Sequence, residues 1–119
     1  MSQPIERFGV ITGMIETAEN LAKDYGITRE QADAFAVRSH QNAAQAWQGG
    51  KFAQQLVPVA IPQRRGDPVI FDHDEGYRTD ASMETLGRLA PIDGKRDPQA
   101  IVTAGNDSQQ NDAAAACLV

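Results

Sequence analysis

The amino-acid sequence predicts an α/β fold of α+β character, with a helical hairpin, then a short β-hairpin and a third helix. Three observations favour this fold. Apolar residues recur every three or four positions from residue 16 to residue 47, which is the period of amphipathic helices. Short runs of Val and Ile between prolines follow from residue 56, as is typical of strands. A helical pattern returns near residue 81, and the 119 residues suit one domain.

Two helices separated by Gly26 are expected in the first half of the sequence. The segment 16–25 begins with acidic residues, which favour a helix N-terminus, and Gly26 is a suitable C-terminal stop. Thr28 and Gln31 have the spacing of a capping box, so a second helix is expected to run from there to about Trp47. The pair is typical of an αα-hairpin. The expected buried face of the second helix carries Ala32, Phe35, Ala36, Ser39, Ala43, Ala46 and Trp47.

Short strands are expected to follow the helices. Residues 56–62 and 68–72 are rich in Val and Ile, and a polar turn joins them. Their prolines restrict these strands to edges or bulges, because proline has no N–H to donate. Residues 81–89 are expected to form the short third helix, and residues 100–104 a last strand.

Composition and charge exclude several classes of function. The net charge of −5 argues against a nucleic-acid partner. The single cysteine, Cys117, excludes an internal disulfide and a multi-cysteine zinc site. Asp72–Glu75 has no second cluster at ligand spacing, so a solvated turn is expected there and no metal. No apolar run approaches the about 20 residues that span a bilayer, and no signal-peptide pattern is visible. A soluble, cytoplasmic protein with no membrane partner is expected.

Three ordered stretches carry a resemblance to a known family. They are "GMIETAENLAKDYGITREQADAFAVRSHQNAA" (13–44), "GKFAQQLVPV" (50–59) and "VTAGNDSQQNDAAAA" (102–116). Together they resemble the thiolase family of acetyl-CoA acetyltransferases and 3-ketoacyl-CoA thiolases, over nearly the whole chain. The resemblance implies that residues 1–104 are the inserted loop domain, which covers the active site and holds coenzyme A. Residues 105–119 would be the return turn and the start of a strand of the first thiolase half.

The resemblance also implies a set of residues that contact coenzyme A. Ser108 matches the serine that contacts the pantetheine arm, and Ala104 and Met14 match residues that line the same channel. Arg78 matches an arginine near the adenine and phosphate end, and Thr85 stands where a serine usually faces the nucleotide. Coenzyme A is then a substrate and not a tightly bound cofactor.

Each of these assignments has a plainer alternative. Ser108 could belong to a solvated turn, Arg78 could be a surface arginine, and Thr85 could be a helix surface residue. Gly105-Asn106 is expected to form the turn because both residues tolerate a positive φ. Asp107 and Gln109 replace the small residues usually found beside the serine, which puts the usual binding geometry in question.

The family's catalytic residues have no counterpart in this sequence. Thiolases use a nucleophilic cysteine upstream of the loop domain, and a histidine and a second cysteine in downstream NEAF, GHP and C-x-G-G-G motifs. None of these motifs is present, and Cys117 in its apolar surroundings is expected to be a core residue of the full enzyme. This chain alone is therefore expected to be inactive and to contain no catalytic residue.

The sequence leaves three functions open. The first is a fragment of a thiolase-type acyl-CoA acyltransferase that contributes the coenzyme A binding loop domain. The alternatives are a non-catalytic coenzyme A binding module and a helical-hairpin interaction protein. The expected partners are a coenzyme A thioester and the rest of a thiolase chain or other thiolase subunits. Self-association is also expected. The local alanine content of residues 111–119 favours a helix, whereas the resemblance implies a turn and then a buried strand whose sheet is not in the sequence.

Overall fold

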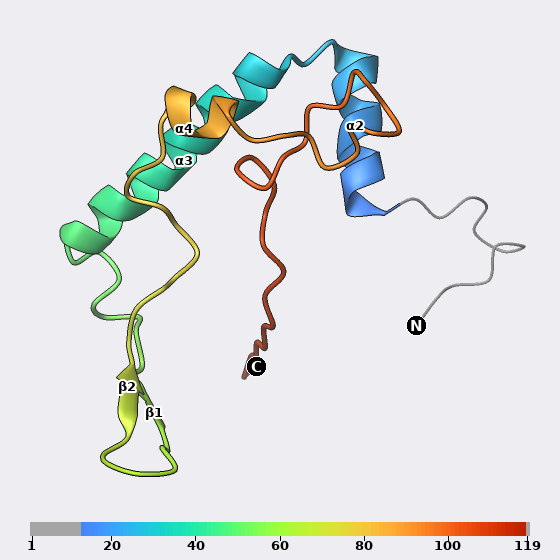
Figure 1. Cartoon of the computed structure of the whole chain (residues 1–119). Coiled ribbons are helices and arrows are strands. Elements are labelled where there is room, and N and C mark those ends of the chain that lie inside the picture. Colours follow the sequence, from blue (N-terminus) through green and yellow to red (C-terminus); the bar gives the residue numbers. More distant parts are fainter. Residues whose placement is uncertain (1–12, 119) are drawn as a thin grey trace, which may run out of the picture.

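The computed structural model describes residues 13–118. Its elements are three helices and one two-stranded sheet, in the order α2 (Met14–Tyr25), α3 (Arg29–Gln48), β1 (Val59–Ile61), β2 (Val69–Phe71) and α4 (Met83–Gly87). The other elements are arranged around helix α3, and α4 packs alongside it. Helix α2 lies at the N-terminal end of α3, and the β-hairpin extends from beyond its C-terminal end (Figure 1). None of the helices between residues 13 and 118 has the length and apolar character required to cross a membrane.

Helix α2 ends and helix α3 begins at the residues that the sequence predicts, whereas α2 begins at Met14, two residues earlier than expected. Helix α2 ends at Gly26, which adopts the left-handed conformation with φ of 64°. Helix α3 begins with the predicted capping box: the Thr28 hydroxyl accepts the Gln31 N–H at 3.3 Å, and the Gln31 side chain accepts the Thr28 N–H at 2.9 Å. These bonds satisfy backbone donors that have no partner within the helix. Local chemistry therefore sets both boundaries.

The β-hairpin is present but shorter than predicted. Its strands pair antiparallel over three residues each, with Ala60 opposite Ile70. Prolines at positions 58, 62 and 68 flank the paired residues, and a proline has no N–H for the ladder. Every residue of both strands is exposed.

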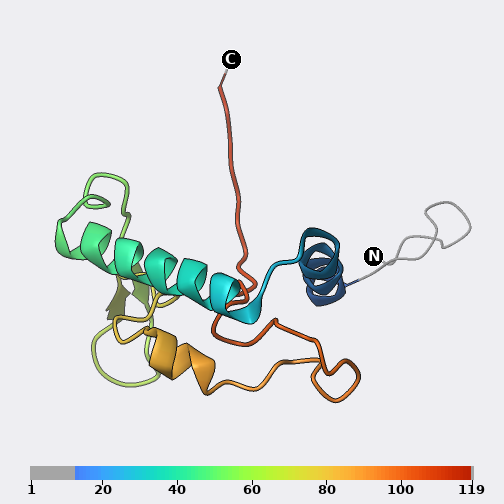
Figure 2. The same ribbon diagram turned by 90° about the horizontal axis from the view of Figure 1, so that it is seen from above.

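The packed αα-hairpin expected from the sequence needs a correction. Over residues 14–48, α2 and α3 follow each other end to end at a steep angle and do not pack side by side (Figure 2). The segment 97–106 returns to lie beside α2 instead (Figure 1). The apolar face of α2 is correspondingly open, since Leu21 is 48% and Tyr25 77% exposed.

The predicted strand over residues 100–104 is wrong. The N–H groups of Ile101 and Val102 donate to the carboxylate of Glu19 on α2, at 3.0 and 2.9 Å, and not to a neighbouring strand. The carbonyl of Val102 accepts the N–H of Ile92 at 2.9 Å. A side chain distant in sequence therefore takes the place of a strand partner.

The end of the described chain forms neither of the elements that were considered for it. Residues 111–118 have no helix or strand, and all of them are exposed, including Cys117. The buried strand that the resemblance implies is therefore not formed within the described residues. A strand needs a sheet to pair with, and the small hairpin lies elsewhere (Figure 1).

The apolar core lies between α3 and α4 and is small. It consists of Ala36, Ala81 and Leu86, with Val37 packed against it. The predicted buried face of α3 is correct at Ala36 and wrong at Phe35, which is 63% exposed. The buried face of α3 is rotated by about one residue from the predicted face. It contains Asp33, Ala36 and Ala44.

Gly105 is required for close approach and not for a positive φ. Neither Gly105 nor Asn106 has a positive φ, so the reason expected from the sequence is wrong. A Cβ at position 105 would lie 2.6 Å from Leu89 Cδ1 and 3.0 Å from Leu86 Cγ. The turn can lie against the end of α4 because this residue has no side chain.

We expect Gly105→Ala to lower the free energy of unfolding by about 1–3 kcal/mol, the usual cost of forcing an extra carbon into a packed site. Gly87→Ala is the matched control, because a Cβ there meets nothing within 4 Å and alanine favours helix over glycine by about 1 kcal/mol. Urea unfolding of both variants measures the difference. Equal midpoints for the two variants would contradict the close approach.

The ion pair between Lys23 and Asp97 should make stability depend on pH. The bond from Lys23 lowers the pKa of Asp97 from its ordinary value of 3.8, and the same bond raises the pKa of Lys23 from 10.5. The contribution of Asp97 is therefore present above 3.8 and lost as pH falls through its folded value. That of Lys23 is present below 10.5 and lost as pH rises through its folded value.

Asp97→Asn should thus lower the urea midpoint at neutral pH, and the difference from wild type should vanish in strong acid. High salt should also reduce it, because the pair is exposed. Asp67→Asn, in the exposed hairpin turn, is the control and should leave the midpoint unchanged. A difference from wild type that persists unchanged in strong acid would show that the pair does not act through charge.

Candidate functional site

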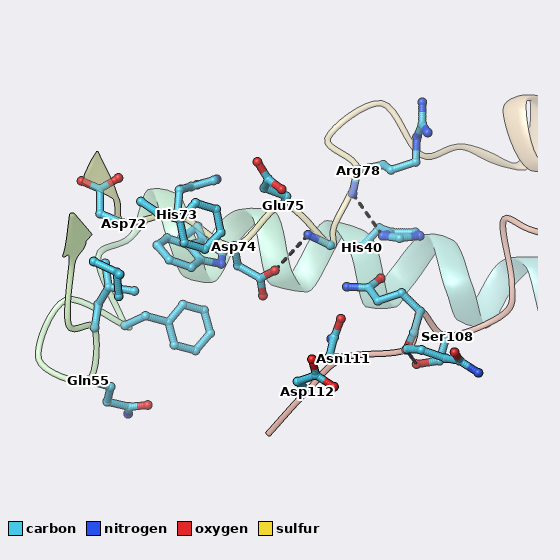
Figure 3. Close-up of a pocket in the computed structure, with 18 of the residues that line it drawn as sticks. His40, Gln55, Asp72, His73, Asp74, Glu75, Arg78, Ser108, Asn111 and Asp112 are labelled. Atoms are coloured by element: carbon cyan, nitrogen blue, oxygen red, sulfur yellow. Dashed lines mark hydrogen bonds between the residues drawn. The ribbon is translucent and has the colours of Figure 1, made fainter. Parts of the chain in front are cut away.

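A cleft of about 1220 Å³ lies between the β-hairpin end of α3 and the C-terminal segment. Four parts of the chain line it: residues from the second half of α3 through β1, the end of β2 with the loop that follows it, Ile92, and the C-terminal segment at Ala104 and residues 107–112 (Figure 3). The hairpin brings the loop after β2 back toward α3, and the turn at residues 103–107 directs the C-terminal segment past it. The cleft therefore depends on contacts between segments far apart in sequence.

One wall of the cleft is aromatic. The ring of Trp47 lies 4.4 Å from that of His73 and 5.3 Å from that of Phe52, measured between centroids. The ring of Tyr77 lies 5.6 Å from that of His73, and its hydroxyl is 2.9 Å from His73 Nε2. Such pairs add about 0.5–1.5 kcal/mol each beyond their buried area.

The sequence did not indicate this aromatic cluster. Trp47 was expected in a helical core, and His73 in a solvated turn. Their contact joins the end of a helix to a loop beyond a hairpin, and nothing in their spacing of 26 positions along the chain relates them. His73 and Tyr77 are hydrogen-bonded to each other, but they lie in an irregular loop, where a spacing of four positions predicts no contact.

The cleft is also lined by polar and mainly acidic side chains, some of them beside His73 and others on the C-terminal segment (Figure 3). Carboxylates come from the loop after β2 and from the C-terminal segment, at Asp72, Asp74, Glu75, Asp107 and Asp112. Among the residues between positions 13 and 118 that line the cleft, Arg78 is the one arginine or lysine. Its guanidinium is 3.4 Å from the Asp80 carboxylate and its side chain is 69% exposed. It can therefore leave this weak contact and reach an anionic ligand at low cost.

His40 connects α3 to the loop that carries Arg78. Its Nδ1 accepts the backbone N–H of Arg78 at 3.2 Å. Nδ1 must be unprotonated to accept this bond, so any ring proton is on Nε2. His40 thus orients the base of the Arg78 loop. No three His, Cys, Asp or Glu side chains among residues 13–118 are placed to hold a metal ion.

A buried polar network holds the turn that leads into the C-terminal wall. The Asp33 carboxylate, on α3, accepts bonds of 2.8 Å from both Arg29 and Asn106. The Asn106 side-chain oxygen, Oδ1, accepts the Thr103 N–H at 2.8 Å. Thr103 is completely buried. These bonds therefore hold the backbone of the turn between Ala104 and Ser108 against α3.

A comparison with protein families gives a match over most of the chain. The model described as "Thiolase, N-terminal domain" matches residues 8–119. The chain belongs to the thiolase family. The resemblance stated from the motifs is therefore confirmed.

Named relatives of this thiolase chain are acyltransferases. It is 54% identical over 103 residues to an acetyl-CoA acetyltransferase of Thiocystis violacea, which covers 87% of this chain and 25% of the relative. It is 52% identical over 103 residues to a probable acetyl-CoA acyltransferase of Staphylococcus aureus (strain COL), with the same coverage. The chain thus spans about a quarter of the length of these relatives.

Solved thiolase structures show the same fold. The acetyl-CoA acetyltransferase of Bacillus anthracis matches with a TM-score of 0.64 and 41% identity, over 80% of this chain and 22% of that one. The enzyme of Syntrophomonas wolfei matches with a TM-score of 0.63 and 46% identity, over 66% of this chain and 20% of that one. The mixed helical fold with a small two-stranded sheet is therefore that of part of a thiolase.

Three of the five residues that the thiolase resemblance selected meet in the cleft. They are Arg78, Ala104 and Ser108, and the Ser108 hydroxyl makes only a long bond of 3.3 Å to the carbonyl of Gln109. Met14 and Thr85 lie outside the cleft. Met14 is 82% exposed in the first turn of α2, and the Thr85 hydroxyl accepts the Ser82 N–H at the start of α4.

Gln109 extends from the C-terminal segment to the loop after β2. A Cβ built on Gly76 would lie 1.8 Å from Gln109 Nε2, so the amide rests directly on this glycine. Both residues line the cleft. Gln109 therefore narrows the cleft beside Ser108, at a point where the facing residue has no side chain.

Proposed function

We propose that this chain supplies the coenzyme A binding loop domain of a thiolase-type acyl-CoA acyltransferase, an enzyme of reversible thiolysis and Claisen condensation. Residues 1–104 form the loop domain in this proposal, and residues 105–119 return the chain to the first thiolase half. The observation that supports it is that Arg78, Ala104 and Ser108 line one cleft. They come from different parts of the sequence and were selected by the thiolase motifs alone.

The chemistry of the cleft suits the two ends of coenzyme A differently. The pantetheine arm is uncharged and carries amides, so it can lie against the small Ala104 while the Ser108 hydroxyl bonds an amide. Arg78 can pair with phosphate and stack on adenine. The carboxylates at positions 72, 74 and 75 and in the C-terminal segment would repel phosphate. The neutral arm therefore lies among the carboxylates, and the phosphates lie toward Arg78.

Met14 and Thr85 take a different place in this proposal. Neither lines the cleft of this chain, yet both are exposed. Each can contact the ligand only outside the cleft, where the ligand passes between this domain and the remainder of a thiolase. Coenzyme A is held as a substrate in this arrangement.

The exposed apolar surface supports an incomplete assembly. The strands of the hairpin expose Val59, Val69, Ile70 and Phe71, and residues 113–118 are exposed throughout. The rest of a thiolase chain or another subunit would cover such surfaces. In their absence, unpaired apolar segments favour self-association.

We predict weak coenzyme A binding that depends on Ser108 and Arg78 in different ways. Ser108→Ala should weaken binding several-fold at every salt concentration, since a neutral hydrogen bond contributes on the order of 1 kcal/mol. Arg78→Ala should weaken binding and flatten its dependence on salt, because salt screens an exposed charge. Calorimetric titration with coenzyme A at low and high salt measures both effects.

Matched controls lie outside the cleft on the exposed face of α3. Ser39→Ala and Arg38→Ala remove the same groups at exposed positions, and the Arg38 guanidinium lies over the Phe35 ring, 5.0 Å from its centroid. Both should bind coenzyme A like wild type. If Ser108→Ala and Arg78→Ala also bind like wild type at either salt, the residues assigned from the family do not form the site.

We also predict that this chain alone does not catalyse thiolysis. An acyl transfer of this kind needs a thiolate nucleophile and an adjacent base. The Cys117 sulfur is exposed and its hydrogen-bond contact is the Leu118 carbonyl at 3.8 Å. Release of acetyl-CoA from acetoacetyl-CoA and coenzyme A should equal the buffer blank. A rate above the blank that Cys117→Ser abolishes would refute the prediction.

A further inference from the structure

Two carboxylates among residues 13–118 are buried and do not line the cleft. Glu19 on α2 is 5% exposed and Asp33 on α3 is 2% exposed, although most acidic side chains lie at the surface. Burying a charge is unfavourable unless hydrogen bonds and an opposite charge compensate it. The partners of these two carboxylates indicate what they do.

Both carboxylates hold the same short segment. Glu19 accepts the N–H groups of Ile101 and Val102, at 3.0 and 2.9 Å. Asp33 accepts from Asn106 Nδ2 at 2.8 Å. Each end of the turn that precedes Ser108 is thus bonded to a different helix.

Asn106 passes this restraint on to the backbone of the turn. Its Nδ2 also donates to the Ile101 carbonyl at 3.0 Å, and its Oδ1 accepts the Thr103 N–H at 2.8 Å. The Thr103 carbonyl in turn accepts the N–H groups of Asn106 and Asp107, at 3.2 and 3.0 Å. Asp107 is the residue directly before Ser108.

Arg29 completes the network with the compensating charge. Its Nε donates to Asp33 at 2.8 Å, and its Nη2 donates to the carbonyls of Leu86 and Leu89, at 2.8 and 3.0 Å. The same two leucines form the surface against which Gly105 packs. The charge on Asp33 is therefore matched, and the turn is held by bonds from α3 and by contact with the end of α4.

We infer that Asp33 and Asn106 form a positioning pair for the ligand-binding turn, with Glu19 as a second anchor. Neither member lines the cleft. The pair acts through the backbone of residues 103–107 and determines the positions of Ala104 and Ser108 in the cleft. The inference rests on the proposed function for the identity of the ligand. A turn that is already ordered loses less conformational freedom when a ligand binds, so affinity depends on the pair.

The decisive test exchanges the hydrogen-bond donor and acceptor of the pair, in two steps. Asn106→Asp places two carboxylates in contact and removes the donor to Ile101. Coenzyme A affinity should fall about tenfold, and amide exchange of residues 106 and 107 should accelerate by at least as much. Adding Asp33→Asn should restore a donor between the two positions. Asp33→Asn should therefore weaken binding in the wild-type background and strengthen it in the Asn106→Asp background.

A second cycle separates positioning from general stability. If the pair acts through Ser108, then Ser108→Ala should cost several-fold in wild type and almost nothing beside Asn106→Asp. A merely structural role would leave the cost of Ser108→Ala unchanged. All titrations use temperatures at which circular dichroism shows each variant folded. Asp24→Asn, on the exposed surface of α2, is the control and should match wild type.

The outcomes distinguish this inference from the proposed function. If wild type does not bind coenzyme A, the proposed function of this chain fails. The amide exchange rates of residues 106 and 107 then still test whether Asp33 and Asn106 order the turn. Unchanged exchange in Asn106→Asp overturns the inference whether or not coenzyme A binds. If wild type binds and Asp33→Asn further weakens the Asn106→Asp variant, the inference is overturned while the proposed function stands.

Discussion

The structure depends on satisfying two buried carboxylates. The apolar core between α3 and α4 contains mostly alanine and one leucine, and no other helix or strand between residues 13 and 118 packs against α2. Glu19 and Asp33 instead bind the returning segment through hydrogen bonds to three donors, two of them backbone N–H groups. Such bonds are directional, so they fix one position of the segment where apolar contact would allow several. The arrangement of the cleft follows from them.

Local features of the sequence predicted the helices well, because the chemistry that ends a helix is local. Thr28, Gln31 and Gly26 perform the roles that their types and spacing indicate. Features that depend on distant residues were not predictable in this way. The segment 100–104 has the composition of a strand, but its backbone donors bond a carboxylate more than 80 positions away. The αα-hairpin failed for the same reason, since the returning segment occupies the side of α2.

Family resemblance and local physics located different parts of the site. The motifs led to Arg78, Ala104 and Ser108, which line the cleft. They did not lead to the aromatic wall around Trp47, or to Asp33, because a pattern of residues does not reveal which side chains become neighbours. Hydrophobic periodicity also treats a buried acid as a surface residue. An acid on the buried face of a helix is informative only once its partners are known.

The position of the network explains how an irregular segment can form one wall of a site. Residues 108–112 line the cleft without any helix or strand, so no hydrogen-bonded ladder orders them. Ser108 is restrained by the residues directly before it, because the Asp107 N–H bonds the carbonyl of the buried Thr103. Gln109 adds a contact of its own, since its amide rests on Gly76 in the loop after β2. A ligand that binds at Ser108 and leaves the later residues free would use the part of the segment whose order is already set.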